Sequence, residues 1–181
     1  MDWRLLLEAR PVVVAVAGSN GAGKTTFFHA HLADTGLRFV NADDLALEMG
    51  VGAYEAAELA ASLRAGLVGQ RESFVFETVL SDPIGGKVSE LAEIARNGIH
   101  VVMVFIRIDS PATSKQRVAM RVLQGGHDVP DEKLEARFQR TLANLERATK
   151  ELPVVVIFDN TNLARPFQLE AVHKNGQRIG P

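Results

Sequence analysis

One segment of the chain combines closely spaced glycines with a lysine and hydroxyl side chains: Gly18-Ser19-Asn20-Gly21-Ala22-Gly23-Lys24-Thr25-Thr26. The spacing matches G-x-x-x-x-G-K-[ST], which arranges backbone N–H groups and a lysine around phosphate. We expect Lys24 to reach the β- and γ-phosphates of ATP and the Thr25 hydroxyl to bind Mg²⁺. An apolar run precedes the segment and a helical pattern follows it, which favours a nucleotide site over an ordinary glycine-rich turn.

Carboxylates follow two further apolar runs that are typical of strands. Asp43 and Asp44 come after residues 38–41, and Glu77 ends the run 73–77. In a parallel α/β sheet such strand ends lie beside the phosphate loop, where a kinase needs a carboxylate to take the proton of a hydroxyl. We predict Asp43 as that base, and Asp44 and Glu77 as substrate contacts. The alternatives are a helix N-cap for Asp43, a cap or metal-shell role for Asp44, and a plain strand-end or magnesium-shell carboxylate for Glu77.

Arginines gather in the region 111–150, which we predict to be a helical lid. Arg117 and Arg121 are four residues apart and so share one helical face, and Arg137 lies on the next helix. Guanidinium groups brought over the transferring phosphoryl would stabilise its charge. The alternative is a solvated helix face, because glutamates lie nearby in the sequence.

Two further polar residues are candidates for the site. His127 lies in the loop Gly125-Gly126-His127-Asp128-Val129-Pro130, where it would contact phosphate or substrate, or only hold the loop. Asn160 follows the last strand of the predicted core, in a loop that often lies by the base in nucleotide-binding folds; its alternative is an Asx-type turn.

The elements that must position these residues alternate between strand and helix. Strands are expected at 12–17, 38–41, 73–77, 99–108 and 154–158, with helices at 24–33, 54–71, 83–97, 111–124 and 131–150, and a hairpin over 169–179. This order predicts a P-loop α/β three-layer sandwich, with a central, mainly parallel sheet of about five strands. We expect a single domain over 1–181.

Two helices carry apolar stripes that predict which face is buried. The stripe of the helix 54–71 is Ala56, Leu59, Ala60, Leu63 and Leu67. The stripe of the helix 131–150 is Leu134, Phe138, Leu142 and Leu145, which predicts that Arg137, Arg140, Asn144 and Arg147 lie on the other side.

Composition narrows the class of protein. The chain has 181 residues, a formal net charge of −2 and 46% hydrophobic residues, which is typical of a globular domain. The slightly acidic balance argues against nucleic acid as a partner, and no apolar run is long enough to span a membrane. The chain has no cysteine, which excludes thiolate chemistry and is consistent with a cytoplasmic protein.

Together these motifs resemble the zeta-toxin family of small P-loop kinases. The resemblance rests on the phosphate loop, the segment Asn41-Ala42-Asp43, the strand end Phe76-Glu77-Thr78, the arginine helix from Arg117, and the Asp159-Asn160 pair before a hairpin. The Gly-Gly-His-x-Val-Pro loop is similar to a branch described as predicted kinases or ATPases.

The resemblance implies an activity and roles for individual residues. Characterised zeta toxins phosphorylate UDP-N-acetylglucosamine on a sugar hydroxyl. By this likeness Asp43 is the base, Lys24 binds the phosphates, Glu77 contacts substrate and Arg117 contacts the γ-phosphate. A second lid arginine of the toxins is replaced near His127. A separate antitoxin is a partner that the resemblance allows.

The sequence therefore predicts an ATP- and Mg²⁺-dependent phosphotransferase acting on a hydroxyl of a small molecule, such as a nucleotide sugar. Two alternatives stay open. One is a nucleotide-gated binding module that hydrolyses ATP slowly. The second is a kinase with a different acceptor, either another small molecule or a polynucleotide.

Overall fold

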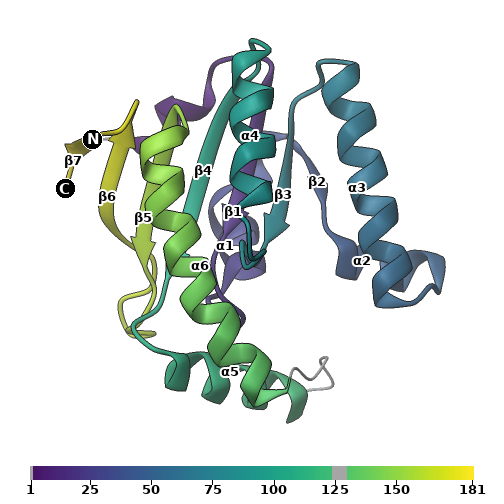
Figure 1. Cartoon of the computed structure of the whole chain (residues 1–181), viewed down its shortest axis with the longest axis vertical. Helices are drawn as coiled ribbons and strands as arrows, with labels where there is room; N and C mark the ends of the chain where they lie inside the picture. Colours follow the sequence, from purple (N-terminus) through teal and green to yellow (C-terminus); the bar gives the residue numbers. More distant parts are fainter. Residues whose placement is uncertain (1, 124–129) are drawn as a thin grey trace.

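The computed structural model describes residues 2–123 and 130–181. A seven-stranded sheet runs through it in the order β2-β3-β1-β4-β5-β6-β7 (Figure 1). The strands are β1 (Val12–Ala17), β2 (Arg38–Val40), β3 (Phe74–Thr78), β4 (His100–Arg107), β5 (Val154–Asp159), β6 (Gln168–Lys174) and β7 (Gln177–Gly180). The first five pair in parallel, and β6 and β7 add an antiparallel hairpin at one edge. The predicted mainly parallel sheet and terminal hairpin are confirmed.

Strand β1 lies in the centre of the sheet and is buried on both faces. Its side chains alternate between two cores, with Val13 and Ala15 in one and Val12 and Val14 in the other. A fully apolar strand is what a parallel sheet covered on both sides requires.

Helices cover both faces of this sheet. They are α1 (Lys24–His31), α2 (Ala42–Met49), α3 (Ala53–Gly69), α4 (Gly86–Arg96), α5 (Pro111–Leu123) and α6 (Asp131–Glu151), with a 3₁₀ turn at Trp3–Leu7 and another at Ala33–Thr35. In Figure 1, α4 and α6 lie in front of the sheet and α1 lies behind it. Helix α5 and the first turns of α6, which belong to the region predicted as a lid, lie at the edge where the parallel strands end.

Two of the predicted helix faces are wrong in part. On α3, Leu63 is exposed, and Arg64 takes the position between buried Ala60 and Leu67. On α6, the apolar stripe is confirmed by buried Leu134 and Phe138, but Asn144, which was predicted on the other side of the helix, is also buried. In both cases a polar side chain occupies a core-facing position because it meets a specific neighbour there.

Within residues 2–123 and 130–181, no helix has the length and apolar character needed to cross a membrane.

Candidate active site

The phosphate loop connects β1 to α1 at the carboxyl edge of the sheet. Gly18 adopts φ +150° and Gly23 adopts φ +94°, backbone conformations that side chains rarely tolerate. A Cβ on Gly18 would lie 2.4 Å from the Ile106 carbonyl oxygen, and one on Gly23 would lie 2.8 Å from Asn160 Nδ2. The loop is therefore shaped by contacts that only glycine permits.

Helix α1 begins at Lys24 without any side-chain cap on its first N–H groups. Such groups, together with the positive end of the helix dipole, suit an anion such as phosphate. The Lys24 ammonium lies beside the loop and donates to the Ser19 carbonyl oxygen at 3.2 Å. Burial of the Lys24 amine lowers its pKa, against the opposing influence of the Glu77 and Asp43 carboxylates. The residues present thus fit a phosphate group.

Two side chains donate to the backbone of the phosphate loop, and a third links α5 to the segment that follows β5. Asn160 Nδ2 donates to the Ala22 carbonyl oxygen at 2.8 Å, and the Asn160 side chain is buried. Ser114 Oγ of α5 donates to the Asn20 carbonyl oxygen at 2.7 Å. Arg117 of α5 donates to the carbonyl oxygens of Asn160 and Thr161 at 2.8 and 2.9 Å. The base of α5 is thereby fixed to the phosphate loop.

This arrangement bears on two predicted residues. The Asx-type turn that was the alternative for Asn160 is made by Asp159, whose Oδ1 accepts from the Thr161 N–H at 2.9 Å. Asn160 itself contacts the loop backbone, and its role toward a nucleotide base stays a prediction. Arg117 uses one nitrogen on carbonyl oxygens, which leaves further N–H donors for its predicted phosphate contact.

The carboxylates after β2 stand in the first turn of α2. The N-cap of this helix is Asn41, whose side chain accepts from the Asp43 N–H at 2.9 Å. The interpretation of Asp43 or Asp44 as the cap is therefore wrong. Both side chains are exposed and neither caps the helix, so either carboxylate is available to a substrate.

Glu77 at the end of β3 joins these groups into one cluster. Asn41 Nδ2 donates to Glu77 Oε1 at 3.5 Å. Burial raises the pKa of the Glu77 carboxyl, while Lys24 and a hydrogen bond from the Thr25 hydroxyl act in the opposite direction. The nearby carboxylates of Asp43 and Asp44 raise that pKa further. A lysine, a threonine and three carboxylates thus converge at the end of two neighbouring strands.

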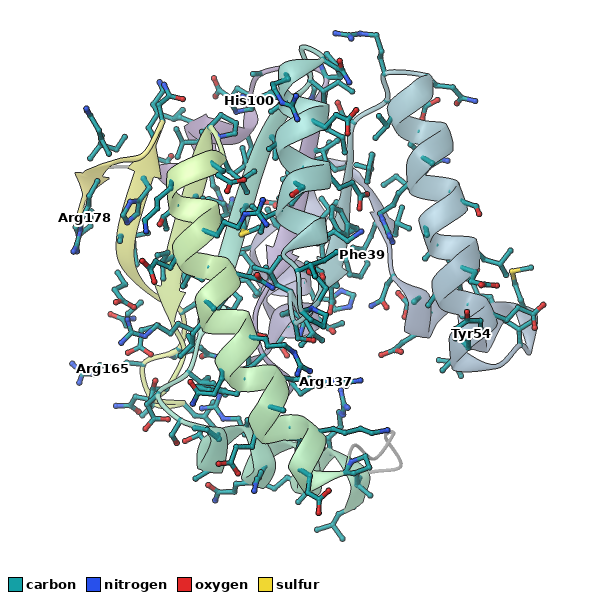
Figure 2. All side chains as sticks on the ribbon, in the orientation of Figure 1. Phe39, Tyr54, His100, Arg137, Arg165 and Arg178 are labelled. Atoms are coloured by element: carbon teal, nitrogen blue, oxygen red, sulfur yellow. The ribbon has the colours of Figure 1, made fainter. Side chains whose placement is uncertain are left out.

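The arginines of α5 and α6 differ in how near they lie to this cluster. Burial has the largest effect on the pKa of Lys24, and the Glu77 carboxylate has the next largest, in the opposite direction. The positive charge of Arg121 is also near enough to lower this pKa. Arg137 is half-buried, and Figure 2 shows its side chain on the side of α6 that faces α2. His127 lies outside the described residues, so its predicted contact is untested.

Helix α6 holds the loop that follows Glu77. Thr141 Oγ1 donates to the Val79 carbonyl oxygen at 2.8 Å, and Asn144 Nδ2 donates to those of Leu80 and Asp82 at 2.9 Å each. The remaining donors come from two arginines of the same helix: Arg140 to the Ser81 carbonyl oxygen at 2.8 Å, and Arg147 to that of Ile84 at 3.0 Å. The alternative of a solvated helix face therefore does not hold for Arg140, since it donates to a backbone carbonyl of this loop, as Asn144 and Arg147 do.

Some residues of the site were missed from the sequence. Asn41 carried a usable signal, since asparagine is a preferred N-cap residue directly before a helix. Ser114 carried none, because its partner Asn20 lies 94 residues away in the chain. Among the described residues there is no group of three or more histidines, aspartates or glutamates placed to hold a metal ion.

The loop after β1, the strand order and the carboxylates at neighbouring strand ends define the P-loop kinase fold. A family model for zeta toxin matches residues 49–170, about two thirds of the chain. The chain therefore belongs to the zeta toxin family, as its motifs predicted. The matched stretch contains Glu77, helices α5 and α6, and Asn160, and it begins after the phosphate loop and Asp43.

Solved structures share this fold at low sequence identity. A complex of AvrRxo1-ORF1 and AvrRxo1-ORF2 with ATP has a TM-score of 0.70 at 20% identity, over 95% of this chain and 61% of that chain. A candidate kinase from Chloroflexus aurantiacus has a TM-score of 0.61 at 19% identity, over 87% of this chain and 90% of that chain. A structure of the PezAT toxin–antitoxin system of Streptococcus pneumoniae has a TM-score of 0.60 at 18% identity, over 83% of this chain and 69% of that chain. Among curated proteins, none matches the chain.

Proposed function

We propose that this protein is a kinase-type phosphotransferase that moves the γ-phosphoryl group of ATP to a hydroxyl of a small molecule. The observation that carries the proposal is the convergence of Lys24, Thr25, Asp43 and Glu77 at the carboxyl ends of β2 and β3, beside the phosphate loop. Membership of the zeta toxin family supports the same reaction class. A nucleotide sugar is the acceptor class that the family likeness favours, UDP-N-acetylglucosamine among them.

The step needs one bond to form and one to break. The acceptor oxygen attacks the γ-phosphorus, the bond from that phosphorus to the β–γ bridging oxygen breaks, and ADP leaves. Asp43 takes the proton of the acceptor hydroxyl, and Glu77 orients the acceptor. Lys24 and the N–H groups of the loop bind the phosphates, and Arg121 with Arg117 stabilises the charge that develops.

Magnesium belongs to this chemistry in P-loop enzymes, where it neutralises charge on the β- and γ-phosphates. Thr25 is the residue that would hold it, with Asp44 in the surrounding shell. The Thr25 hydroxyl already hydrogen-bonds Glu77, so an oxygen-rich setting of the kind that Mg²⁺ prefers surrounds it.

The test is transfer from γ-labelled ATP to a panel of sugar nucleotides, sugars, nucleosides and short oligonucleotides, read by mass spectrometry. Lys24→Ala serves as the blank. We expect one acceptor class to gain a phosphoryl group in the wild type and none in the blank. Lys24-dependent phosphate release without any labelled acceptor would instead favour the nucleotide-gated module. A labelled oligonucleotide end, with steeply salt-dependent binding, would favour a polynucleotide kinase.

A protein partner follows from the same likeness. An antitoxin would be a separate chain, and the PezAT toxin–antitoxin system is one of the solved structures that share the fold. Co-purification from the source cell of a protein whose addition stops the transfer reaction is the expected result for such a partner.

A further inference from the structure

Helix α3 carries an arginine on the face that packs against the sheet. Ala56, Ala60 and Leu67 form its buried stripe, and Arg64 lies four residues after Ala60 and three before Leu67. A long charged side chain in such a position requires a reason, because an aliphatic residue would fill the space without any polar group to satisfy.

The Arg64 guanidinium lies against the aromatic surface of the core. Its central carbon is 4.9 Å from the centre of the Phe76 ring. Arg64 Nε is shielded from solvent and has no hydrogen-bond partner among the described residues. Burial lowers the pKa of Arg64, and the carboxylate of Glu90 on α4 partly opposes that effect. Glu90 is itself paired with Lys87, so it does not satisfy the guanidinium alone.

A cavity of about 220 Å³ opens beside this group. Its apolar and aromatic walls are formed by Ala65, Val68, Phe74, Phe76 and Ile94. Two charged side chains, Arg64 and Glu90, complete the lining. A cavity of about 150 Å³ holds a benzene molecule, so this one accommodates a ring with a short polar substituent.

We propose that this cavity binds a small carboxylate with a flat apolar body, whose oxygens accept from the Arg64 guanidinium. A planar guanidinium pairs with a carboxylate through two parallel hydrogen bonds, and the aromatic walls match a flat hydrocarbon. A phosphate dianion fits less well, because one cation faces it and Glu90 adds a negative charge at the rim.

The cavity is distinct from the phosphotransfer site. Side chains alternate along β3, so Phe76 points to the face covered by α3 and α4, whereas Glu77 points to Lys24 on the other face. Phe76 and Glu77 are nevertheless adjacent in the chain. The cavity and the predicted substrate contact therefore share strand β3 but lie on opposite faces of the sheet.

The experiment titrates phenylacetate and 3-phenylpropionate into the protein by calorimetry, with phenylacetamide as the uncharged analogue. We expect the carboxylates to bind and to raise the melting temperature, and the amide to bind at least about tenfold more weakly. Arg64→Met should weaken carboxylate binding by a similar factor, while Glu90→Gln should strengthen it. Arg96→Met, an exposed arginine on α4, is the matched control and should change nothing.

Three results would overturn the proposal: no binding of either carboxylate at millimolar concentration, equal affinity for the amide, or unchanged affinity in Arg64→Met. If Arg64→Met does not fold, Arg64→Lys keeps the charge but not the planar pair of donors and should also weaken binding. The opposite response of Glu90→Gln stays informative in either case, because that variant leaves the arginine in place.

Discussion

Glu77 is the residue whose environment departs most clearly from that of an ordinary strand-end carboxylate. Burial and the neighbouring carboxylates favour its protonated form, and Lys24 and Thr25 oppose this only in part. A raised pKa means that the folded protein keeps the proton at pH values at which the unfolded chain has lost it. The contribution of Glu77 to stability is thus present below the ordinary pKa of 4.5 and is lost as the pH rises through the higher folded value.

The first prediction concerns how stability changes with pH because the pKa of Glu77 is raised in the folded protein. As the pH rises above the ordinary glutamate pKa of 4.5, the wild type should lose stability relative to Glu77→Gln. The measurement is urea unfolding of both proteins across this pH range. Parallel stability curves would contradict the account of a carboxyl whose pKa is raised in the fold.

A second prediction concerns the glycine that begins the phosphate loop. In Gly18→Ala, the new Cβ would meet the Ile106 carbonyl oxygen at 2.4 Å, so the loop must move. We expect a loss of about 1–3 kcal/mol of stability together with a large loss of ATP affinity. Gly36→Ala is the control, since Gly36 also has a positive φ but a Cβ there would meet nothing within 4 Å. Calorimetric ATP titration should leave Gly36→Ala near the wild type; equal losses in both variants would count against a shaped loop.

At the scale of elements, α6 acts as a scaffold for the loop 79–85. Leu80 in that loop has φ +58°, an uncommon conformation for a branched residue, and its side chain is buried. The donors of Thr141 and Asn144 fix the backbone on either side of it. The loop directly follows Glu77 and Thr78, so α6 helps to set where the end of β3 lies.

The third prediction removes this support. Asn144→Leu leaves the carbonyl oxygens of Leu80 and Asp82 without their donor, and we expect a loss of about 2–3 kcal/mol. Amide hydrogen exchange should become faster in residues 79–85, while β1 stays protected. Gln139→Leu on the exposed face of α6 is the matched control and should change stability by less than about 0.5 kcal/mol. Unchanged exchange in Asn144→Leu would show that the loop holds its form alone.

Local patterns predicted most elements well because apolar runs and helical periodicity depend on neighbours in the sequence. The strand 12–17 matches β1 in full, and the helix expected from residue 111 begins there as α5. Errors arose where distant segments decide. Arg64 faces the core because the Phe76 ring lies beneath it, and Asn144 is buried because carbonyls of the loop 79–85 meet it.

The residues of the candidate site likewise include some that local patterns predict and some that depend on distant segments. The phosphate loop and the strand-end position of Glu77 were predictable, because both depend on a motif or on the order of strands. The cap at Asn41 and the brace from Ser114 to Asn20 were not predicted. The brace depends on a contact between α5 and the loop, which no local pattern encodes.

The candidate active site lies at the carboxyl ends of the central parallel strands. Nucleotide bound there should stabilise the whole folded molecule. A ligand that binds only the folded state adds about 2.7 kcal/mol at one hundred times its dissociation constant. The fourth prediction is that ATP with Mg²⁺ raises the melting temperature of the wild type and has little effect on Lys24→Ala. Equal shifts in both proteins would place the nucleotide elsewhere.

The central claim is that Asp43 is the base of a phosphotransferase built on this edge of the sheet. The most direct measurement compares phosphoryl transfer by wild type, Asp43→Asn and Asp44→Asn, using the acceptor found in the panel, with ATP affinity measured in parallel. We predict that Asp43→Asn lowers kcat by about 10²–10⁴-fold while ATP affinity is retained, and that Asp44→Asn costs far less. Transfer that continues undiminished in Asp43→Asn would contradict the account.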